Sequence, residues 1–138
     1  AIASDGDGFK DGASRVSMFY SLKVNDDAKA EWKDHYLNYT KGAKASKGHV
    51  NVSHSYNEET REVICIETIT GKDAMSNHIG NCLPHYAQML GCGVQMKEII
   101  CVCDPAEMEW FKASLAAWQP ERLICTPDHC PGERERVY

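Results

Sequence analysis

Residues 49–70, with the sequence HVNVSHSYNEETREVICIETIT, contain the pattern that is most informative about the fold class. In its first half apolar and aromatic residues alternate with polar ones, and this period of two predicts a β-strand over residues 49–56. Its second half contains a β-branched run around Val63 and Ile66, which predicts another strand over residues 61–70. Because only the four polar residues 57–60 separate the two strands, we predict an antiparallel hairpin.

Similar patterns precede and follow this hairpin. Residues 15–24 alternate between apolar and polar side chains, which predicts the first strand. Asn25 then provides an N-cap for an amphipathic helix of roughly 18 residues. After the hairpin, apolar residues recur at helical spacing from Lys72 to Leu90. We expect Pro84 to bend this second helix or to divide it into two, because proline disrupts a helix interior.

The last third of the chain predicts three more elements. Residues 94–103 alternate again and form a fourth strand. Asp104 followed by Pro105 is a strong start signal for a third helix, which ends before Pro120. Residues 121–126 predict a short fifth strand. The order is therefore β-α-β-β-α-β followed by a helix and a strand, which is the split βαβ arrangement of a ferredoxin-like α+β fold with an antiparallel sheet.

Such a sheet has helices on one face and needs a second cover for the other. Apolar strand residues such as Ile64 and Ile66 share faces with threonine and lysine, so an isolated protomer would expose apolar sheet to water. We therefore expect a homodimer in which two sheets cover each other, as in a dimeric α+β barrel. The folded domain is predicted over residues 15–126, between a flexible arm at residues 1–14 and a tail at residues 127–138.

Composition excludes several partners. The net charge of −5 and the lack of an arginine and lysine stripe argue against nucleic acid. No apolar run reaches the roughly 20 residues that cross a bilayer, so we expect a soluble protein. None of the motifs GxGxxG, GxxxxGK[ST], GxSxG or HExxH occurs, which leaves nucleotide-dependent and common hydrolase mechanisms without support.

Seven cysteines are a high and odd number for a chain of 138 residues. Those at positions 65, 101 and 103 lie in predicted strands and Cys82 lies in a predicted helix, so we expect buried, reduced thiols that act as small hydrophobic residues. This favours a reducing compartment, the cytoplasm or an organelle after removal of a targeting peptide. The spacing of Cys125 and Cys130 is compatible with a local disulfide and with part of a metal site, and the sequence does not distinguish these two interpretations.

Four stretches resemble the antibiotic-biosynthesis-monooxygenase-like branch of the dimeric α+β barrel superfamily. They are VSMFYSLKV, AKASKGHVNVSHSY, VICIETITGKDAMSNHIG with Glu67 and His78, and CDPAEMEWFKASLAAWQPERLICT. The resemblance implies a homodimer with a pocket between sheet and helices in each protomer. Many relatives oxidise quinol-like or polycyclic aromatics with O2 and no metal or flavin, others bind or degrade haem, and some have no known activity. Ile69 stands where relatives often carry a tryptophan.

His78 matches the histidine of the second helix in this family, and a neutral imidazole can take a phenolic proton near neutral pH. We therefore predict that His78 is the catalytic base; a histidine on the helix surface is the alternative. His78, Cys82 and His85 are zinc-type ligands on one helix face, but Pro84 interrupts that face, and we expect no metal or cofactor. Six side chains are predicted to wall the pocket and bind substrate: Phe19, Trp32, Tyr36, Ile66, Leu83 and Tyr86.

Functions of different classes remain open. The first is a small cofactor-independent monooxygenase-like enzyme that acts on a quinol-like or polycyclic aromatic. The second is a non-catalytic structural or accessory subunit that docks into a larger protein assembly through its terminal arms. A haem- or pigment-binding module is a third alternative.

Overall fold

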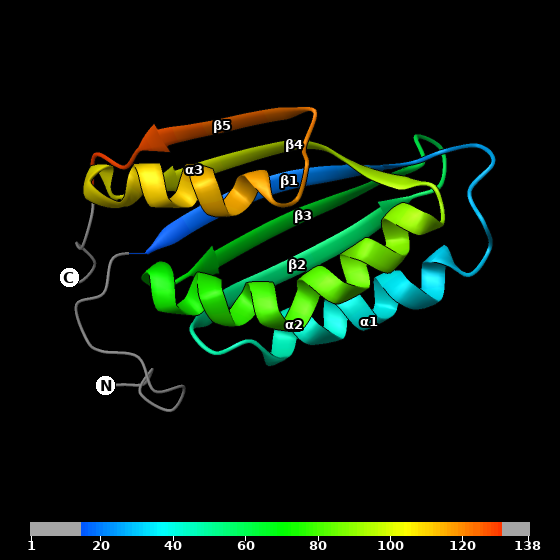
Figure 1. The fold of residues 1–138 in the computed structure, drawn as a ribbon, viewed down its shortest axis with the longest axis horizontal. Coiled ribbons are helices and arrows are strands. Elements are labelled where there is room, and N and C mark those ends of the chain that lie inside the picture. Colours follow the sequence, from blue (N-terminus) through cyan, green and yellow to red (C-terminus); the bar gives the residue numbers. More distant parts are fainter. Residues whose placement is uncertain (1–14, 131–138) are drawn as a thin grey trace.

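The computed structural model describes residues 15–130 (Figure 1). Predictions made for residues 1–14 and 131–138 lie outside this part of the chain. The predicted order of elements is confirmed, and with it the ferredoxin-like α+β fold. In sequence the elements are β1 (Val16–Val24), α1 (Trp32–Ala45), β2 (His49–Asn57), β3 (Glu62–Ile69), α2 (Gly71–Gly91), β4 (Val94–Cys103), the short 3-10 helix η2 (Pro105–Glu107), α3 (Met108–Ala116) and β5 (Arg122–Pro127).

The five strands form one sheet in the order β2-β3-β1-β4-β5. β1 lies in the middle and pairs antiparallel with both β3 and β4. The sequence predicts a fully antiparallel sheet, but β5 pairs parallel with β4, so the sheet is mixed. The physical reason is the crossover through α3, which returns the chain to the start of β4 before β5 begins.

All three helices cover the same face of the sheet, and the core lies between them (Figure 1). The strands meet this core through every second residue, as a period of two requires. In β1 the buried side chains are Val16, Met18, Tyr20, Leu22 and Val24.

The opposite face of the sheet carries apolar side chains that no helix covers. Phe19, Ile64 and Ile66 are 48%, 44% and 37% exposed. They are neighbours, because Phe19 pairs with Ile66 across β1 and β3 and with Ile100 across β1 and β4.

The first helix begins later than predicted. α1 starts at Trp32, and Asn25 does not cap it. Instead, the Asn25 N–H donates to the Gly93 carbonyl, and the Asn25 carbonyl accepts from the Ala28 N–H. These bonds connect Asn25 to the residue before β4. The residues that follow Asn25 form turns, so the helix begins only at Trp32.

The second helix is not divided at Pro84, since α2 runs unbroken from Gly71 to Gly91. Proline lacks the N–H that would bond the carbonyl four residues earlier, which belongs to Gly80. Gly80 lies at an exposed position, where water can satisfy that carbonyl. The expected break therefore does not occur.

α1 and α2 approach closely at one glycine. A Cβ atom on Gly42 would lie 2.7 Å from the backbone oxygen of Asn81 and 3.4 Å from the Cys82 sulfur. Gly42 thus lets the two helices pack backbone against backbone, which places the side chains of α2 over the sheet.

All seven cysteines are free. Cys65, Cys82, Cys101 and Cys103 are buried, which confirms their interpretation as interior thiols. No disulfide joins Cys125 to Cys130. Among the described residues, no helix has both the length and the apolar character that crossing a membrane requires.

Candidate active site

A carboxylate lies in the interior of the protein. The alternation of β3 turns Cys65, Glu67 and Ile69 toward the helices, and all three are fully buried. Burying an ionised carboxylate is costly unless hydrogen bonds and opposite charge compensate it. The surroundings of Glu67 are therefore the part of the core where unusual polar contacts are expected.

Four side chains from three elements surround Glu67. The imidazole of His54 on β2 lies with Nε2 2.7 Å from Oε2 of Glu67, and the hydroxyl of Tyr20 on β1 donates to the same oxygen. Nε2 of His49, at the start of β2, lies 3.2 Å from Oε1. Nε2 of His78 on α2 lies 3.6 Å from Oε1. The carboxylate is thus held on both oxygens.

These contacts set the charge state of the site. Burial alone would raise the pKa of Glu67, but the hydrogen bonds from His49 and His54 and the charge interaction with His78 hold it well below its usual value. Burial lowers the pKa of His78 to about 4, although the Glu67 charge acts in the opposite direction. At neutral pH the site therefore holds an ionised Glu67 beside a neutral His78.

Two hydrogen-bond chains extend from the carboxylate. His54 donates to Glu67 through Nε2, so its Nδ1 accepts from the Thr40 hydroxyl at 2.9 Å. Tyr20 donates to Glu67, so its oxygen accepts from the Tyr39 hydroxyl at 2.8 Å. Burial raises the pKa of both tyrosines, which therefore stay protonated and can act as donors.

The second ring nitrogen of His78 lies beside a thiol. Nδ1 is 3.4 Å from the Cys82 sulfur, and the Cys82 thiol donates to the Tyr39 carbonyl at 3.6 Å. In the tautomer in which Nδ1–H of His78 donates to this sulfur, Nε2 carries a lone pair and can accept a proton.

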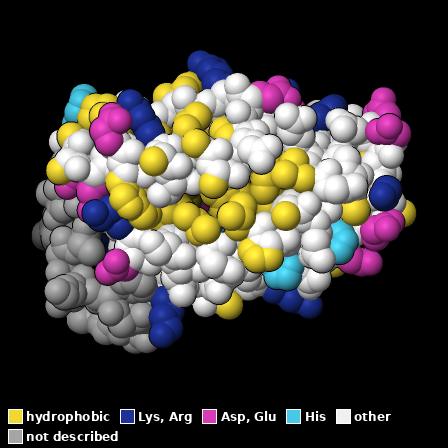
Figure 2. Space-filling view, viewed as in Figure 1, with side chains coloured by type: hydrophobic (Ala, Val, Ile, Leu, Met, Phe, Trp, Pro, Cys, Tyr) yellow, Lys and Arg dark blue, Asp and Glu magenta, His cyan; other side chains and the backbone are white. Residues whose placement is uncertain are grey.

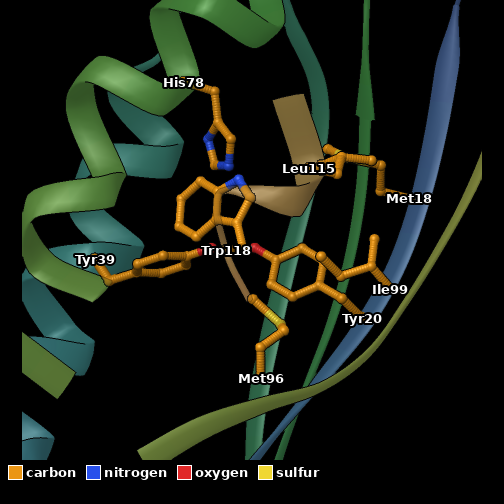
Figure 3. Close-up of a pocket in the computed structure, with 8 residues that line it drawn as sticks. All are labelled: Met18, Tyr20, Tyr39, His78, Met96, Ile99, Leu115 and Trp118. Atoms are coloured by element: carbon orange, nitrogen blue, oxygen red, sulfur yellow. Dashed lines mark hydrogen bonds between the residues drawn. The ribbon is translucent and has the colours of Figure 1, made fainter. Parts of the chain in front are cut away.

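Figure 3 shows the hollow beside this network. One end is polar, with the hydroxyls of Tyr20 and Tyr39 and the ring of His78. The rest of the lining is apolar. The space open to the centre of a water molecule is only about 10 Å³, which is room for about one water. The lining residues are Met18, Tyr20, Tyr39, His78, Met96, Ile99, Leu115 and Trp118.

Of the residues predicted for the site, His78 lines this hollow. Tyr86 lies behind the lining, where its ring contacts Trp118 with centroids 5.2 Å apart. Leu83 packs against the core without lining the hollow. Trp32 lies against Tyr36 and against Tyr56, in a separate aromatic group.

The structure corrects the placement of Phe19 and Ile66. Both side chains point to the face of the sheet that the helices do not cover, and both are exposed. The period of two explains this, because the neighbours Tyr20 and Glu67 occupy the inward positions of β1 and β3.

Sequence reasoning misses most of the polar network. Glu67 alternates with Cys65 and Ile69 on β3, so it lies on the strand face that is otherwise apolar and points to the core. A charged residue at such a position indicates a functional or paired group. Tyr20 likewise lies on the face of β1 that points to the core. No local pattern signals His49 or Tyr39, because only tertiary packing brings them to the site.

Three of these side chains could in principle hold a metal ion. His49, Glu67 and His78 each offer a ligand atom, and these atoms lie within 4.8 Å of one another. An ion would displace the proton through which His49 bonds Glu67 and move it to Nδ1 of His49. That buried nitrogen has no hydrogen-bond partner, whereas metal-bound histidines normally donate through their second nitrogen. The residues therefore fit a hydrogen-bonded network better than a metal centre.

Comparisons with known proteins identify the fold. No protein-family model matches the chain, and no curated protein matches it in sequence. The solved structure of MupZ from Pseudomonas fluorescens has a TM-score of 0.64 at 12% identity and covers 91% of this chain and 89% of its own. SnoaB, a cofactor-independent oxygenase from Streptomyces nogalater, has a TM-score of 0.51 at 18% identity and covers 64% of this chain and 91% of its own.

A candidate antibiotic biosynthesis monooxygenase from Deinococcus radiodurans has a TM-score of 0.52 at 13% identity and covers 62% of this chain and 88% of its own. These identities are low, so the likeness concerns the fold. The chain therefore has the ferredoxin-like α+β fold of the antibiotic biosynthesis monooxygenase-like proteins, as its sequence resemblance predicts.

Proposed function

We propose that this protein is a small monooxygenase-like enzyme that acts without metal or flavin on a quinol-like or polycyclic aromatic. The observation that carries the proposal is the pairing of a neutral His78 with an ionised Glu67 at the polar end of an otherwise apolar hollow. The fold shared with a cofactor-independent oxygenase supports the same class of chemistry.

The first step is the transfer of a phenolic proton to Nε2 of His78. The imidazolium that forms lies beside Oε1 of Glu67, at 3.6 Å, and the carboxylate stabilises its charge. The hydroxyl of Tyr39 can turn from Tyr20 and donate to the phenolate oxygen, because Tyr20 keeps its own bond to Glu67. These residues thus favour the electron-rich form of the substrate.

The second step is the reaction of this anion with O2. Anthrone reacts as its enol tautomer, whose phenolic proton is the one that His78 removes. A C–O bond then forms at the activated ring carbon, and the O–O bond and the remaining C–H bond at that carbon break. One oxygen atom stays on the carbon, and the other leaves as water with the two hydrogens lost from the substrate. The substrate supplies all four electrons that reduce the two oxygen atoms of O2, so the reaction balances without a redox cofactor.

Oxygen consumption with anthrone in the presence of a chelator tests the proposal. We expect His78→Ala to lower kcat by about 10²–10⁴, the usual contribution of a general base. His35→Ala, on α1 and outside the lining of the hollow, should keep the wild-type rate. Equal rates in wild type and His78→Ala would remove His78 from the mechanism.

The small volume of the hollow favours a second candidate, a non-catalytic accessory subunit in a larger protein assembly. Room for about one water excludes an aromatic ring unless a side chain moves, and a haem or pigment would require a larger rearrangement. Absence of oxygen consumption with all phenolic and anthrone-type compounds, from a folded protein, would favour this candidate over the enzyme.

We also propose that two protomers pair through the uncovered face of the sheet. Its centre is apolar, with Phe19, Ile64, Ile66 and Ile100 on adjacent strands, and serines 17, 21, 53 and 55 occupy the same face. Exposed apolar patches of this kind usually mark an interface. A second copy is the occupant that we favour, because a self-complementary apolar face suits an isologous dimer.

A further inference from the structure

Three aromatic rings enclose the indole of Trp118. The ring of His78 stacks on it with centroids 5.8 Å apart and an interplanar angle of 28°. Tyr39 meets it edge-on at 6.0 Å, and Tyr86 lies at 5.2 Å. Figure 3 shows the indole between His78 and the two tyrosines of the polar end, Tyr20 and Tyr39. Trp118 therefore fills the position next to the proton acceptor.

The enclosing rings are held by bonds that do not involve the indole. Tyr39 bonds Tyr20 through its hydroxyl, and His78 bonds Cys82 through Nδ1. The hydroxyl of Tyr86 accepts from the Met96 N–H and donates to the backbone carbonyl of Trp118. The three rings can therefore keep their places when the indole leaves.

The indole itself is held by packing. The Trp118 side chain is almost fully buried, and no hydrogen bond joins its ring N–H to another described residue. The indole can therefore change rotamer without breaking a polar contact to these residues.

Trp118 lies on a connection, since α3 ends at Ala116 and β5 begins at Arg122. The next residue, Gln119, has a positive φ of 52°, which ends the helix. The backbone of Trp118 is fixed, because its N–H donates to the Leu115 carbonyl and its carbonyl accepts from Tyr86. The movement that we consider is therefore a rotamer change of the side chain alone.

We propose that the cage of His78, Tyr39 and Tyr86 is the binding site for the substrate's aromatic ring, and that Trp118 occupies this site until a ligand displaces it. The inference rests on the proposed function, which places the substrate beside His78. It explains how a hollow with room for one water serves a planar ligand. The ligand class is a fused bicyclic or larger aromatic with a hydroxyl group, because it replaces an indole and presents an oxygen to Tyr39 and His78.

The surface offers an entrance for such a ligand. Figure 2 shows hydrophobic side chains gathered across the middle of the helical face, between α3 and α2. The hollow itself is lined by His78 from α2 and by Leu115 from α3, which lie on the two sides of this band. We place the entrance at this band, because it lies between the two helices that contribute His78 and Leu115 to the lining of the hollow.

Binding of β-naphthol, measured by calorimetry, tests this inference. If wild-type protein must displace its own indole, Trp118→Phe and Trp118→Ala should bind more tightly than wild type. We expect a gain of about tenfold, which corresponds to about 1.4 kcal/mol. Trp110→Phe, on α3 and outside the lining of the hollow, is the matched control and should bind as wild type does.

The sign of the change decides between two roles for Trp118. Equal or weaker binding by the Trp118 variants would make it a permanent wall and overturn the proposal. Should both variants fail to fold, the indole N–H resonance of Trp118 in the wild type decides instead: we expect a large shift on β-naphthol saturation, and no shift contradicts displacement. Binding requires no turnover, so these results stand apart from the oxygen-consumption assay.

Discussion

At the scale of single residues, Glu67 determines the arrangement of the site. Three donors from His49, His54 and Tyr20 converge on its two oxygens in a fully buried place. We expect Glu67→Gln to lower the free energy of unfolding by about 1–3 kcal/mol, because an amide cannot accept all three bonds and leaves a donor unsatisfied. Urea unfolding at neutral pH measures the change.

Glu62→Gln provides the control for this substitution. Glu62 lies on the same strand but bonds Lys97 at 3.5 Å near the surface, so its loss should cost about 0–1 kcal/mol. Equal stability of Glu67→Gln and wild type would contradict the network described for Glu67.

The charge states of His78 and Glu67 also predict how stability depends on pH. His78 has its pKa lowered from 6.5 to about 4, so between these values the unfolded chain binds a proton that the folded protein does not. Stability should therefore fall as the pH drops from 6.5 toward 4. Glu67 has its pKa held below 4.5, so its contribution is present above that value and is lost as the pH falls further.

Unfolding curves in urea across this pH range measure the effect. His78→Phe removes a group that titrates in this range, so the loss of stability between pH 6.5 and 4.5 should be smaller in this variant than in the wild type. If the free energy of unfolding changed with pH equally in the wild type and in His78→Phe above pH 4.5, His78 would not be the titrating group.

At the scale of elements, the crossing of α1 and α2 sets the position of His78 over the sheet. We expect Gly42→Ala to destabilise the protein by about 1–3 kcal/mol, because the new methyl meets the rigid backbone oxygen of Asn81. Gly80→Ala, in open space on the same pair of helices, should stabilise by about 0.5–1 kcal/mol. Thermal melts of both variants supply the comparison, and a stabilised Gly42→Ala would contradict the close packing.

The elements themselves are largely predictable from the sequence, and the exceptions have physical causes. The alternating strands follow from a period of two that a buried face enforces. The start of α1 is missed because Asn25 bonds Gly93, a partner 68 residues away, in place of its own helix. The site is predicted only through His78, since the contacts of Glu67 with His49 and His54 require the register of β2 against β3.

At the scale of the whole molecule, the uncovered sheet face predicts a dimer. We expect Ile66→Asp to dissociate it, because a buried aspartate without a partner is costly at the centre of an apolar interface. Sedimentation analysis compares this variant with Leu37→Asp, which places the same charge on an exposed apolar position of α1. A monomeric wild type, or a dimeric Ile66→Asp, would contradict pairing through this face.

The whole account depends on proton removal at His78 followed by reaction with O2. The most direct measurement is mass spectrometry of the product formed from anthrone under isotopically labelled O2 with a chelator present. We expect one labelled oxygen atom in the product of the wild type and no product above background from His78→Ala. Product that carries oxygen from water, or labelled product formed equally by His78→Ala, would contradict it.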